Sequence, residues 1–426
     1  MLPTDDVGLG SMTDSNTNSN GDHPKKQASY FVTLMNILNT LIGAEILGIP
    51  NSMTFCGLVP LLILLTMTAI LSYIATILIT RLQNRFAATS INDLTDKLLG
   101  RWGGIILSIL TLAFAYSCLI AYIVTASDTI ESWMKLAKIP EWTKGWKRAI
   151  VVCIYSLLIP VLLTTPRDLS YLNAASTFAI FSVVVYMVVM IVKAIQFFPH
   201  HPIDASVETS DMNIHFFHAF ALHSLMFALP GIVLPILIPY HPSLNKRYHV
   251  IGSAFVVCYI LTIIPGVIGY LMFGATTNQI IFSSFPDNDW MIQVARVGFF
   301  VVLNASYPVI SMTVLTELSN LLYKVGDPAD ATLKQRIVIL TINNIPPVLI
   351  GMVLPKVRPA LAIGGAFGGC LTNFTIPPLL WVKQSNCGWF HWTNILCYLF
   401  ITFGVISAGI ATYEAVEDAI NTFKNN

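Results

Sequence analysis

The amino-acid sequence predicts an all-α membrane protein with about eleven transmembrane helices. Of its 426 residues, 55% are hydrophobic and only 11% are charged, against roughly 25% charged in an ordinary soluble domain. Apolar runs of about 20 residues, the length at which an α-helix crosses a bilayer, recur along the whole chain. Because several connections between these runs are short, we expect a single membrane domain.

Eleven apolar runs qualify as candidate spans. They cover residues 29–56, 58–80, 103–130, 148–165, 172–198, 213–239, 249–273, 291–323, 334–354, 358–382 and 389–414. Residues 1–28 are polar and are predicted to form a disordered cytosolic tail. The predicted membrane domain therefore covers residues 29–426. The amphipathic segment from Ser90 to Gly100 is expected to be an interfacial helix.

The distribution of Lys and Arg predicts the orientation of the chain. With the N-terminus in the cytosol, more of these residues fall in cytoplasmic loops than in outside loops, which is the usual preference. The loop from Glu131 to Arg148 is the exception, because it is rich in basic residues. We therefore expect a cytosolic N-terminus and, after eleven spans, a C-terminus on the opposite side.

The first span carries an interruption. Residues 36 to 50 read NILNTLIGAEILGIP, which puts Gly43, Glu45, Gly48 and Pro50 inside a membrane-length apolar run. Pro removes a backbone donor and each Gly costs roughly 1 kcal/mol of helix propensity relative to Ala, so we expect this helix to break. Broken helices at the bilayer midplane bind cargo in secondary transporters through the freed N–H and C=O groups.

The sixth span carries a second interruption. Residues 228 to 235 read ALPGIVLP, with Pro230 and Gly231 adjacent. Breaks at corresponding positions in two halves of a chain indicate an inverted repeat with the binding site between the halves. The first and sixth spans would correspond in a repeat of five plus five helices. The eleventh span then falls outside the repeat.

Four segments resemble the amino acid/auxin permease family, which includes sodium-coupled neutral amino acid transporters and vacuolar or lysosomal amino acid transporters. Residues 39–50 (NTLIGAEILGIP) resemble its opening signature, and 218–223 (HAFALH) its sixth-helix motif. Residues 304–309 (NASYPV) are similar to its eighth-helix element, and 364–369 (GGAFGG) to its tenth-helix glycine cluster. The resemblance implies the fold of the sodium-coupled leucine transporter, with broken helices 1 and 6.

The broken helix and the resemblance together predict the substrate site. The expected substrate-binding residues are Thr40, Leu41, Gly43, Ala44, Glu45, Phe220 and His223. Backbone N–H groups around Gly43 to Glu45, at the start of a half-helix, would face the carboxylate of an amino acid. Alternatively, the small residues only permit tight helix packing. His223 is either a pH sensor or proton relay, or a helix-packing histidine.

Glu45 departs from the family pattern, which usually has a small or hydroxyl residue at this position. A carboxylate at bilayer depth costs several kcal/mol unless it is paired, hydrated or protonated. Three alternative roles are open for Glu45. In the first it would carry the coupling proton, in the second it would face a positive group of the substrate, and in the third it would make a local hydrogen bond at the helix end.

Asn39 and Ser306 are the expected cation-binding residues. The resemblance implies that they supply side-chain oxygens to a sodium ion between the first and eighth helices. In the alternative reading they only hydrogen-bond neighbouring helices. The residues therefore leave sodium and proton coupling both open.

These observations predict a secondary active transporter that moves amino acids by alternating access. An amino-acid-binding membrane sensor with little net transport is the alternative. No P-loop, catalytic triad or metal motif is visible, so we expect neither an enzyme nor a cofactor. The expected partners are an amino acid and the lipid bilayer, and the net charge of +1 gives no case for nucleic acid. We expect a monomer in a plasma membrane or a lysosome- or vacuole-like membrane.

Overall fold

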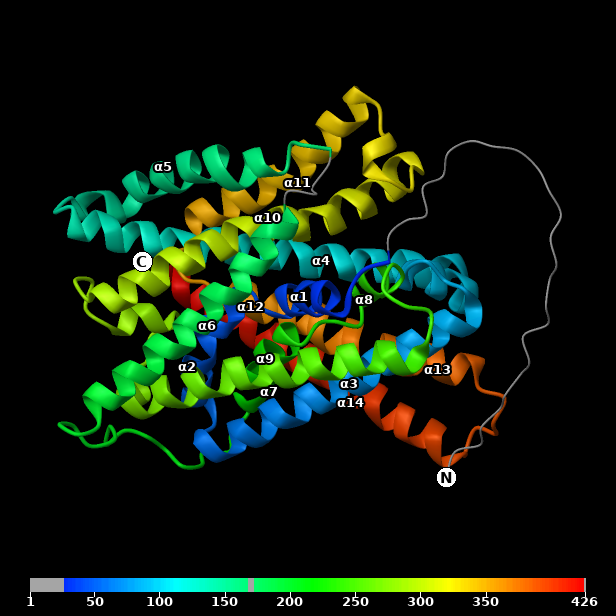
Figure 1. Ribbon diagram of the computed structural model, residues 1–426, viewed down its shortest axis with the longest axis horizontal. Helices are drawn as coiled ribbons and strands as arrows, with labels where there is room; N and C mark the ends of the chain where they lie inside the picture. Colours follow the sequence, from blue (N-terminus) through cyan, green and yellow to red (C-terminus); the bar gives the residue numbers. More distant parts are fainter. Residues whose placement is uncertain (1–26, 168–171, 425–426) are drawn as a thin grey trace.

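The computed structural model describes residues 27–167 and 172–424, and within these residues every regular element is a helix (Figure 1). The elements are α1 (Tyr30–Leu41), η1 (Ala44–Gly48), α2 (Ile49–Ser52), η2 (Met53–Phe55), α3 (Leu58–Phe86), α4 (Ile91–Leu136), η3 (Pro140–Thr143), α5 (Gly145–Ser156), η4 (Leu157–Val161), α6 (Leu172–Phe197), α7 (Phe216–Met226), α8 (Val233–Leu237), α9 (Leu244–Phe273), η5 (Gly274–Thr276), η6 (Ile281–Ser284), α10 (Trp290–Tyr323), η7 (Pro328–Asp330), α11 (Leu333–Val353), α12 (Arg358–Gly364), η8 (Gly365–Asn373), α13 (Ile376–Gln384) and α14 (Trp392–Lys424). The predicted tail, residues 1–28, lies outside the described residues except for 27 and 28.

The all-helical membrane class is confirmed. Among the described residues, eight helices are long and apolar enough to cross a bilayer, or nine when the two parts of the first span are taken together. The predicted ranges 148–165 and 213–239 also hold helices, but these are short: α5 continues into η4, and α7 is separated from α8. The protein is therefore an integral, multi-pass membrane protein.

The first span is broken, as its sequence predicts. Helix α1 ends at Leu41, a new helical segment begins at Ala44, and the two parts are bent by 52°. The connecting residues Ile42 and Gly43 have extended backbones. Pro50 does not make the break, because it lies in the first turn of α2, where a helix needs no N–H donor.

The sixth span is broken as well. Helix α7 ends at Met226 and α8 begins at Val233, so Pro230 and Gly231 lie in the non-helical connection. The segment predicted to be interfacial is helical too. It forms the first part of α4, which is separated from the long remainder by a kink at Gly100.

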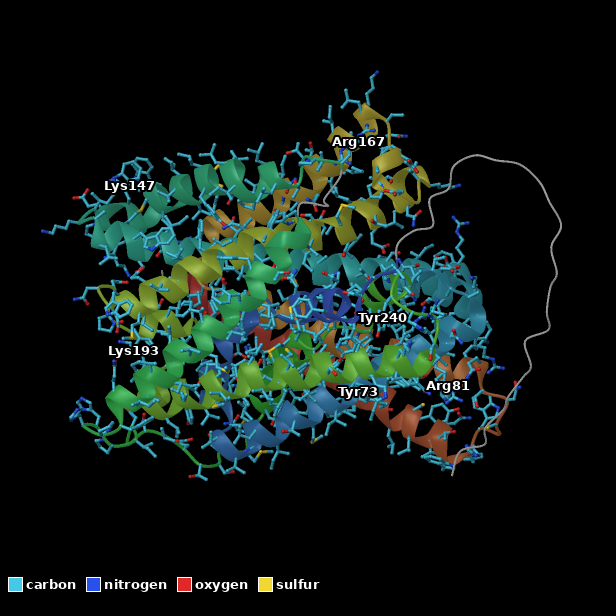
Figure 2. The ribbon with its side chains drawn as sticks, viewed as in Figure 1. Tyr73, Arg81, Lys147, Arg167, Lys193 and Tyr240 are labelled. Atoms are coloured by element: carbon cyan, nitrogen blue, oxygen red, sulfur yellow. The ribbon has the colours of Figure 1, made fainter. Side chains whose placement is uncertain are left out.

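The two parts of the first span lie in the middle of the helix bundle (Figure 1). Helix α1 contacts α6, α8 and α9, and η1 contacts α4, α7 and α9. Charged side chains mark the two ends of the long axis. Arg81 and Arg167 lie toward one end, which we call the Arg81 end, and Lys147 and Lys193 toward the other, the Lys193 end (Figure 2).

Candidate functional site

A cavity of about 340 Å³ lies beside the break in the first span. Its size falls within the range of small-molecule sites, roughly 300–1,000 Å³. Its walls come from α1, α4, the connection between α7 and α8, and α10, and include Asn39, Thr40, Asn92, Thr111, Tyr122, Gly231, Ser306, Glu317 and Asn320. The cavity therefore joins both interrupted spans to the two longest helices.

The cavity extends toward the Arg81 end. Ser90, which follows the α3–α4 connection, and Asn320, in the last turn of α10, both line it. Between them, the side-chain amide of Asn92 donates a hydrogen bond to the carboxylate of Glu317. The residues at this mouth are polar, which suits a path for a hydrophilic solute.

Two buried hydroxyl groups in the cavity wall have no hydrogen-bond partner among the described residues. Ser306 is 3% exposed and Thr111 is 8% exposed, and both line the cavity. Buried polar atoms are nearly always paired in folded proteins. The two hydroxyls thus remain available to a polar ligand in the cavity.

Three of the predicted site residues meet in this cavity. Asn39 and Ser306, the expected cation-binding pair, lie in its wall on α1 and α10. Thr40 lines it as well, and its hydroxyl donates to the backbone carbonyl of Asn36 at 2.8 Å. Residues far apart in the chain therefore line the same cavity, and their assignment as a cation site stays a prediction.

The turn that contains Glu45 does not line the cavity. Leu41, Ala44 and Glu45 are all buried. The carboxylate of Glu45 folds back over Gly43, with both oxygens within 3.0 Å of the position of a methyl group built there. It therefore lies near the backbone N–H groups of Gly43 and of Glu45 itself, which favour its charged form. This placement resembles a local helix-end contact, one of the three roles that the sequence left open.

Tyr122 connects this turn to the cavity. A methyl group built on Gly43 would lie 2.6 Å from Glu45 Oε2 and 2.9 Å from the Tyr122 hydroxyl oxygen. Tyr122 also lines the cavity. The Tyr122 side chain thus stands between the Glu45 turn and the open space.

The remaining two predicted residues lie elsewhere. Phe220 is fully buried and packs its ring against Phe374 and Phe403, with centroids 5.3 and 4.9 Å away. His223 is also fully buried, and its Nε2 lies 3.1 Å from the hydroxyl of Ser52. Neither lines the cavity. His223 instead links α7 to the second part of the broken first span.

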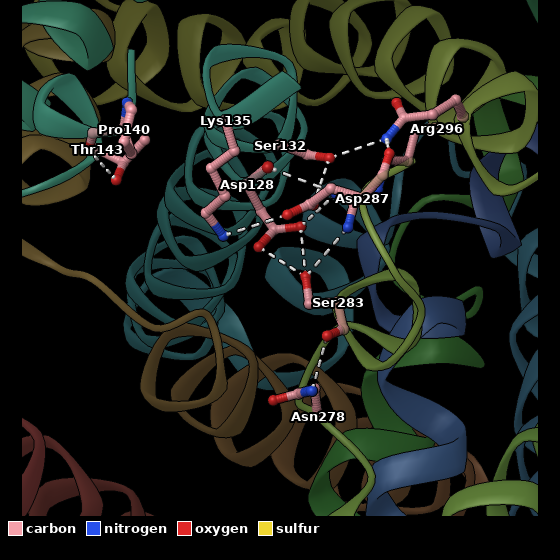
Figure 3. A network of polar contacts seen from close by, with 10 residues as sticks. Asp128, Ser132, Lys135, Pro140, Thr143, Asn278, Ser283, Asp287 and Arg296 are labelled. Carbon is pink, nitrogen blue, oxygen red and sulfur yellow. Dashed lines mark hydrogen bonds and ion pairs between the residues drawn. The ribbon is translucent and has the colours of Figure 1, made fainter. Parts of the chain in front are cut away.

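A polar network holds the Lys193 end together (Figure 3). Arg296 Nη1 donates to Asp128 Oδ2 at 2.8 Å, and the Ser283 hydroxyl donates to the same oxygen at 2.8 Å. Nearby, the Ser132 hydroxyl donates to Asp287 Oδ1 at 2.7 Å. These bonds tie α4 to α10 and to the loop that precedes α10.

Arg358 extends this network to the broken first span. Its Nη2 donates to Asn51 Oδ1 at 2.8 Å, and Asn51 Nδ2 donates to the Thr277 carbonyl at 2.6 Å. A polar pocket of about 350 Å³ lies here, with Asn51, Asp128 and Arg358 in its wall. The second part of the first span is thereby attached to α12 and to the loop after α9.

Sequence reasoning missed several of these residues. Thr111, Tyr122, Arg296 and Arg358 were not singled out as site residues from the sequence. The available signal was the presence of polar side chains within long apolar helices, since such groups usually face a bundle interior or a cavity.

A helical membrane domain with a discontinuous first helix, and with a cavity beside the break whose wall includes polar side chains, has the form of a transport protein. Comparison with known families specifies which kind. Residues 26–417 match the family described as transmembrane amino acid transporter protein, and the chain belongs to this family.

Known relatives are distant but cover most of the chain. The chain is 24% identical to amino acid transporter AVT6E of Arabidopsis thaliana, over 86% of this chain and 79% of that protein. It is 22% identical to putative sodium-coupled neutral amino acid transporter 11 of Danio rerio, over 87% and 82%. It is 21% identical to sodium-coupled neutral amino acid transporter 7 of Xenopus laevis, over 88% and 86%.

Proposed function

We propose that the protein is a secondary active transporter that moves amino acids across a membrane by alternating access. The observation that carries this proposal is the cavity with polar side chains in its wall beside the broken first span, which extends toward the Arg81 end, while hydrogen bonds and ion pairs join the helices at the Lys193 end. Alternating access requires a central site that is reached from one side at a time. The names of the relatives support amino acids as the cargo and favour transport over sensing.

In this proposal the chain has eleven spans, with an inverted repeat of five plus five helices. The interruptions between Leu41 and Ala44 and between Met226 and Val233 support it, because they lie in the first and sixth predicted spans. Helix α5 with η4, and α7 with α8, would then be the two spans that are too short to be recognised by length.

The amino acid would lie in the cavity beside Thr40, with its carboxylate directed at the backbone N–H groups of Gly43, Ala44 and Glu45. Helix N-termini favour negative charge, which supports this orientation. Three of the predicted site residues would lie behind the residues that line the cavity: Leu41, Phe220 and His223. Their burial in the adjoining core supports a role in shaping the site rather than touching the substrate.

The transport would be coupled to sodium or to protons. For sodium, Asn39 and Ser306 offer side-chain oxygens from α1 and α10 at the wall of one cavity, and unwound carbonyls beside them can complete such a site. For protons, Glu45 is the carboxyl group at the break. The two arrangements use different atoms and do not exclude one another.

The N-terminus would be cytosolic, so the Arg81 end would face the cytosol and the cavity would be open inward. The concentration of Lys and Arg in the loops at that end supports this orientation. We further propose that the protein works as a monomer in a plasma membrane or in a lysosome- or vacuole-like membrane.

Uptake into proteoliposomes tests the proposed function. The purified full-length protein is reconstituted, and a panel of radiolabelled L-amino acids is offered under an imposed sodium gradient or proton gradient. We expect at least one amino acid to accumulate above its external concentration under one gradient. Failure of every amino acid to accumulate under both gradients, with protein of verified insertion, would contradict the proposal.

A further inference from the structure

We propose that Glu45 is a built-in competitor of the substrate. Its carboxylate occupies the backbone N–H groups at the break of the first span, and an amino acid binds by displacing it. This inference rests on the proposed amino acid transport. It adds the displacement of Glu45, which lowers the affinity for the amino acid and couples amino acid binding to the uptake of a proton.

The position of the Glu45 carboxylate supports this role. A break in a helix leaves the first N–H groups of its second part without carbonyl partners, and carboxylates are favoured ligands for such groups. Here the carboxylate of Glu45, a residue that is 6% exposed, folds back over Gly43, and both of its oxygens lie within 3.0 Å of the position of a methyl group built on that residue. A tethered carboxylate thus lies where the carboxylate of an amino acid would bind.

The neighbouring cavity shows that Glu45 does not fill the whole site. Ser306 and Thr111 are each more than nine-tenths buried, line the cavity and have hydroxyl groups without partners in the described part of the chain. Tyr122 lines this space, and its hydroxyl lies next to Gly43 in the Glu45 turn. Room and unused polar groups for a free solute therefore lie directly beside the occupied N–H groups.

Gly43 leaves room for this arrangement. Glu45 Oε2 and the Tyr122 hydroxyl would both lie within 3 Å of a methyl group at position 43, so a side chain there would displace the ends of these two side chains. The absence of a side chain at position 43 thus suits the folded-back conformation of Glu45.

The groups near Glu45 carry no positive charge. From α4, the hydroxyl of Tyr122 lies beside the Gly43 position over which the carboxylate folds. The nearest titratable groups from α4 and α9 besides Tyr122 are the buried thiols of Cys118 and Cys258. Helix α7 also packs on this turn, but its His223 turns Nε2 to the hydroxyl of Ser52. No ion pair joins Glu45 to a cation within residues 27–167 and 172–424.

Two carboxylates cannot share these donors, because like charges at contact distance repel strongly in a low-dielectric site. When the substrate carboxylate takes the N–H groups, Glu45 moves into apolar surroundings and binds a proton that enters from solvent through the cavity. Each binding event thus consumes one proton. By linkage, a lower pH strengthens amino acid binding.

Equilibrium binding to the purified full-length protein tests the inference, with a tritiated mixture of the protein L-amino acids as the probe. In the wild type, half-saturation should shift to higher concentration as pH rises, by at most about tenfold per pH unit for a single proton. Glu45→Ser should bind about tenfold more tightly at pH 7 and lose the pH dependence, since 1.4 kcal/mol of competition is a factor of ten. Glu45→Gln should also lose the pH dependence.

Glu414→Gln is the matched control, because Glu414 is a comparably buried carboxyl group on α14 that does not line the cavity. It should bind like the wild type at every pH. Weaker binding by Glu45→Ser, or an unchanged pH dependence in both Glu45 variants, would overturn the inference while leaving the transport proposal intact. If Glu45→Ser does not fold, the pH dependence of binding by Glu45→Gln tests the inference instead. Absence of binding by the wild type and the control would instead reject the transport proposal itself.

Discussion

Asn39 and Ser306 meet at one cavity although they lie on helices far apart in the chain. Both are buried, and both belong to long apolar segments where a polar side chain is unfavourable without a partner or a function. The hydroxyl of Ser306 has no partner among the described residues. This oxygen would coordinate a sodium ion bound between α1 and α10.

Replacement of Ser306 tests the cation site. Ser306→Ala removes one oxygen donor and keeps the helix, so we expect the sodium concentration for half-maximal uptake to rise about fivefold or more, equivalent to about 1 kcal/mol. Sodium-dependent uptake into proteoliposomes is the measurement. Ser319→Ala is the control, because Ser319 is buried on the same helix but does not line the cavity, and within the described part of the chain its hydroxyl also has no partner. Equal sodium activation in both variants would remove Ser306 from the site.

The sequence could predict which residues of the first span are special, but not how their side chains are arranged. Asn39 and Thr40 precede the break and reach the cavity, whereas the folding back of Glu45 depends on a local backbone bend. Phe220 and His223 could not be placed, because nearly every residue of α7 is buried. A helix that is apolar all round has no periodicity that distinguishes the face toward the site from the face toward the core.

At the level of elements, α7 and η8 pack closely against each other. The glycine cluster in η8 lies against α7, and a methyl group built on Gly365 would be 2.1 Å from the backbone oxygen of Ala221. The backbone of Ala221 cannot move away from such a methyl group as easily as the end of a flexible side chain could. The sequence indicated this glycine cluster through the family resemblance, but the helix that it contacts became known only from the structure.

A pair of glycine substitutions tests this packing. Gly365→Ala forces α7 and η8 apart, and we expect it to lower the free energy of unfolding by about 1–3 kcal/mol, the usual cost of overpacking. Gly409→Ala is the control, because Gly409 lies on exposed α14 with no atom within 4 Å of the added methyl group. It should leave stability unchanged or raise it slightly. The apparent Tm in detergent measures both, and equal Tm values would show that the contact is not tight.

At the scale of the whole molecule, the two ends differ. The Arg81 end contains the mouth of the 340 Å³ cavity, and the Lys193 end is joined by the Asp128–Arg296 and Asn51–Arg358 contacts. Composition and apolar runs were sufficient to predict a helical membrane protein. They could not predict which contacts join the helices at the Lys193 end, because these contacts are between residues from α4, α10, α12 and two loops.

The most direct test of alternating access measures both ends in one experiment. Thr313 lines the cavity, and Val124, 2% exposed, lines the pocket at the Lys193 end. Thr313→Cys and Val124→Cys are each introduced into a variant without reactive cysteines and treated with a membrane-impermeant thiol reagent in permeabilised proteoliposomes. Without substrate, Thr313→Cys should react and Val124→Cys should not. A transported amino acid should slow the first reaction and allow the second, whereas unchanged reactivity at both positions would contradict the account.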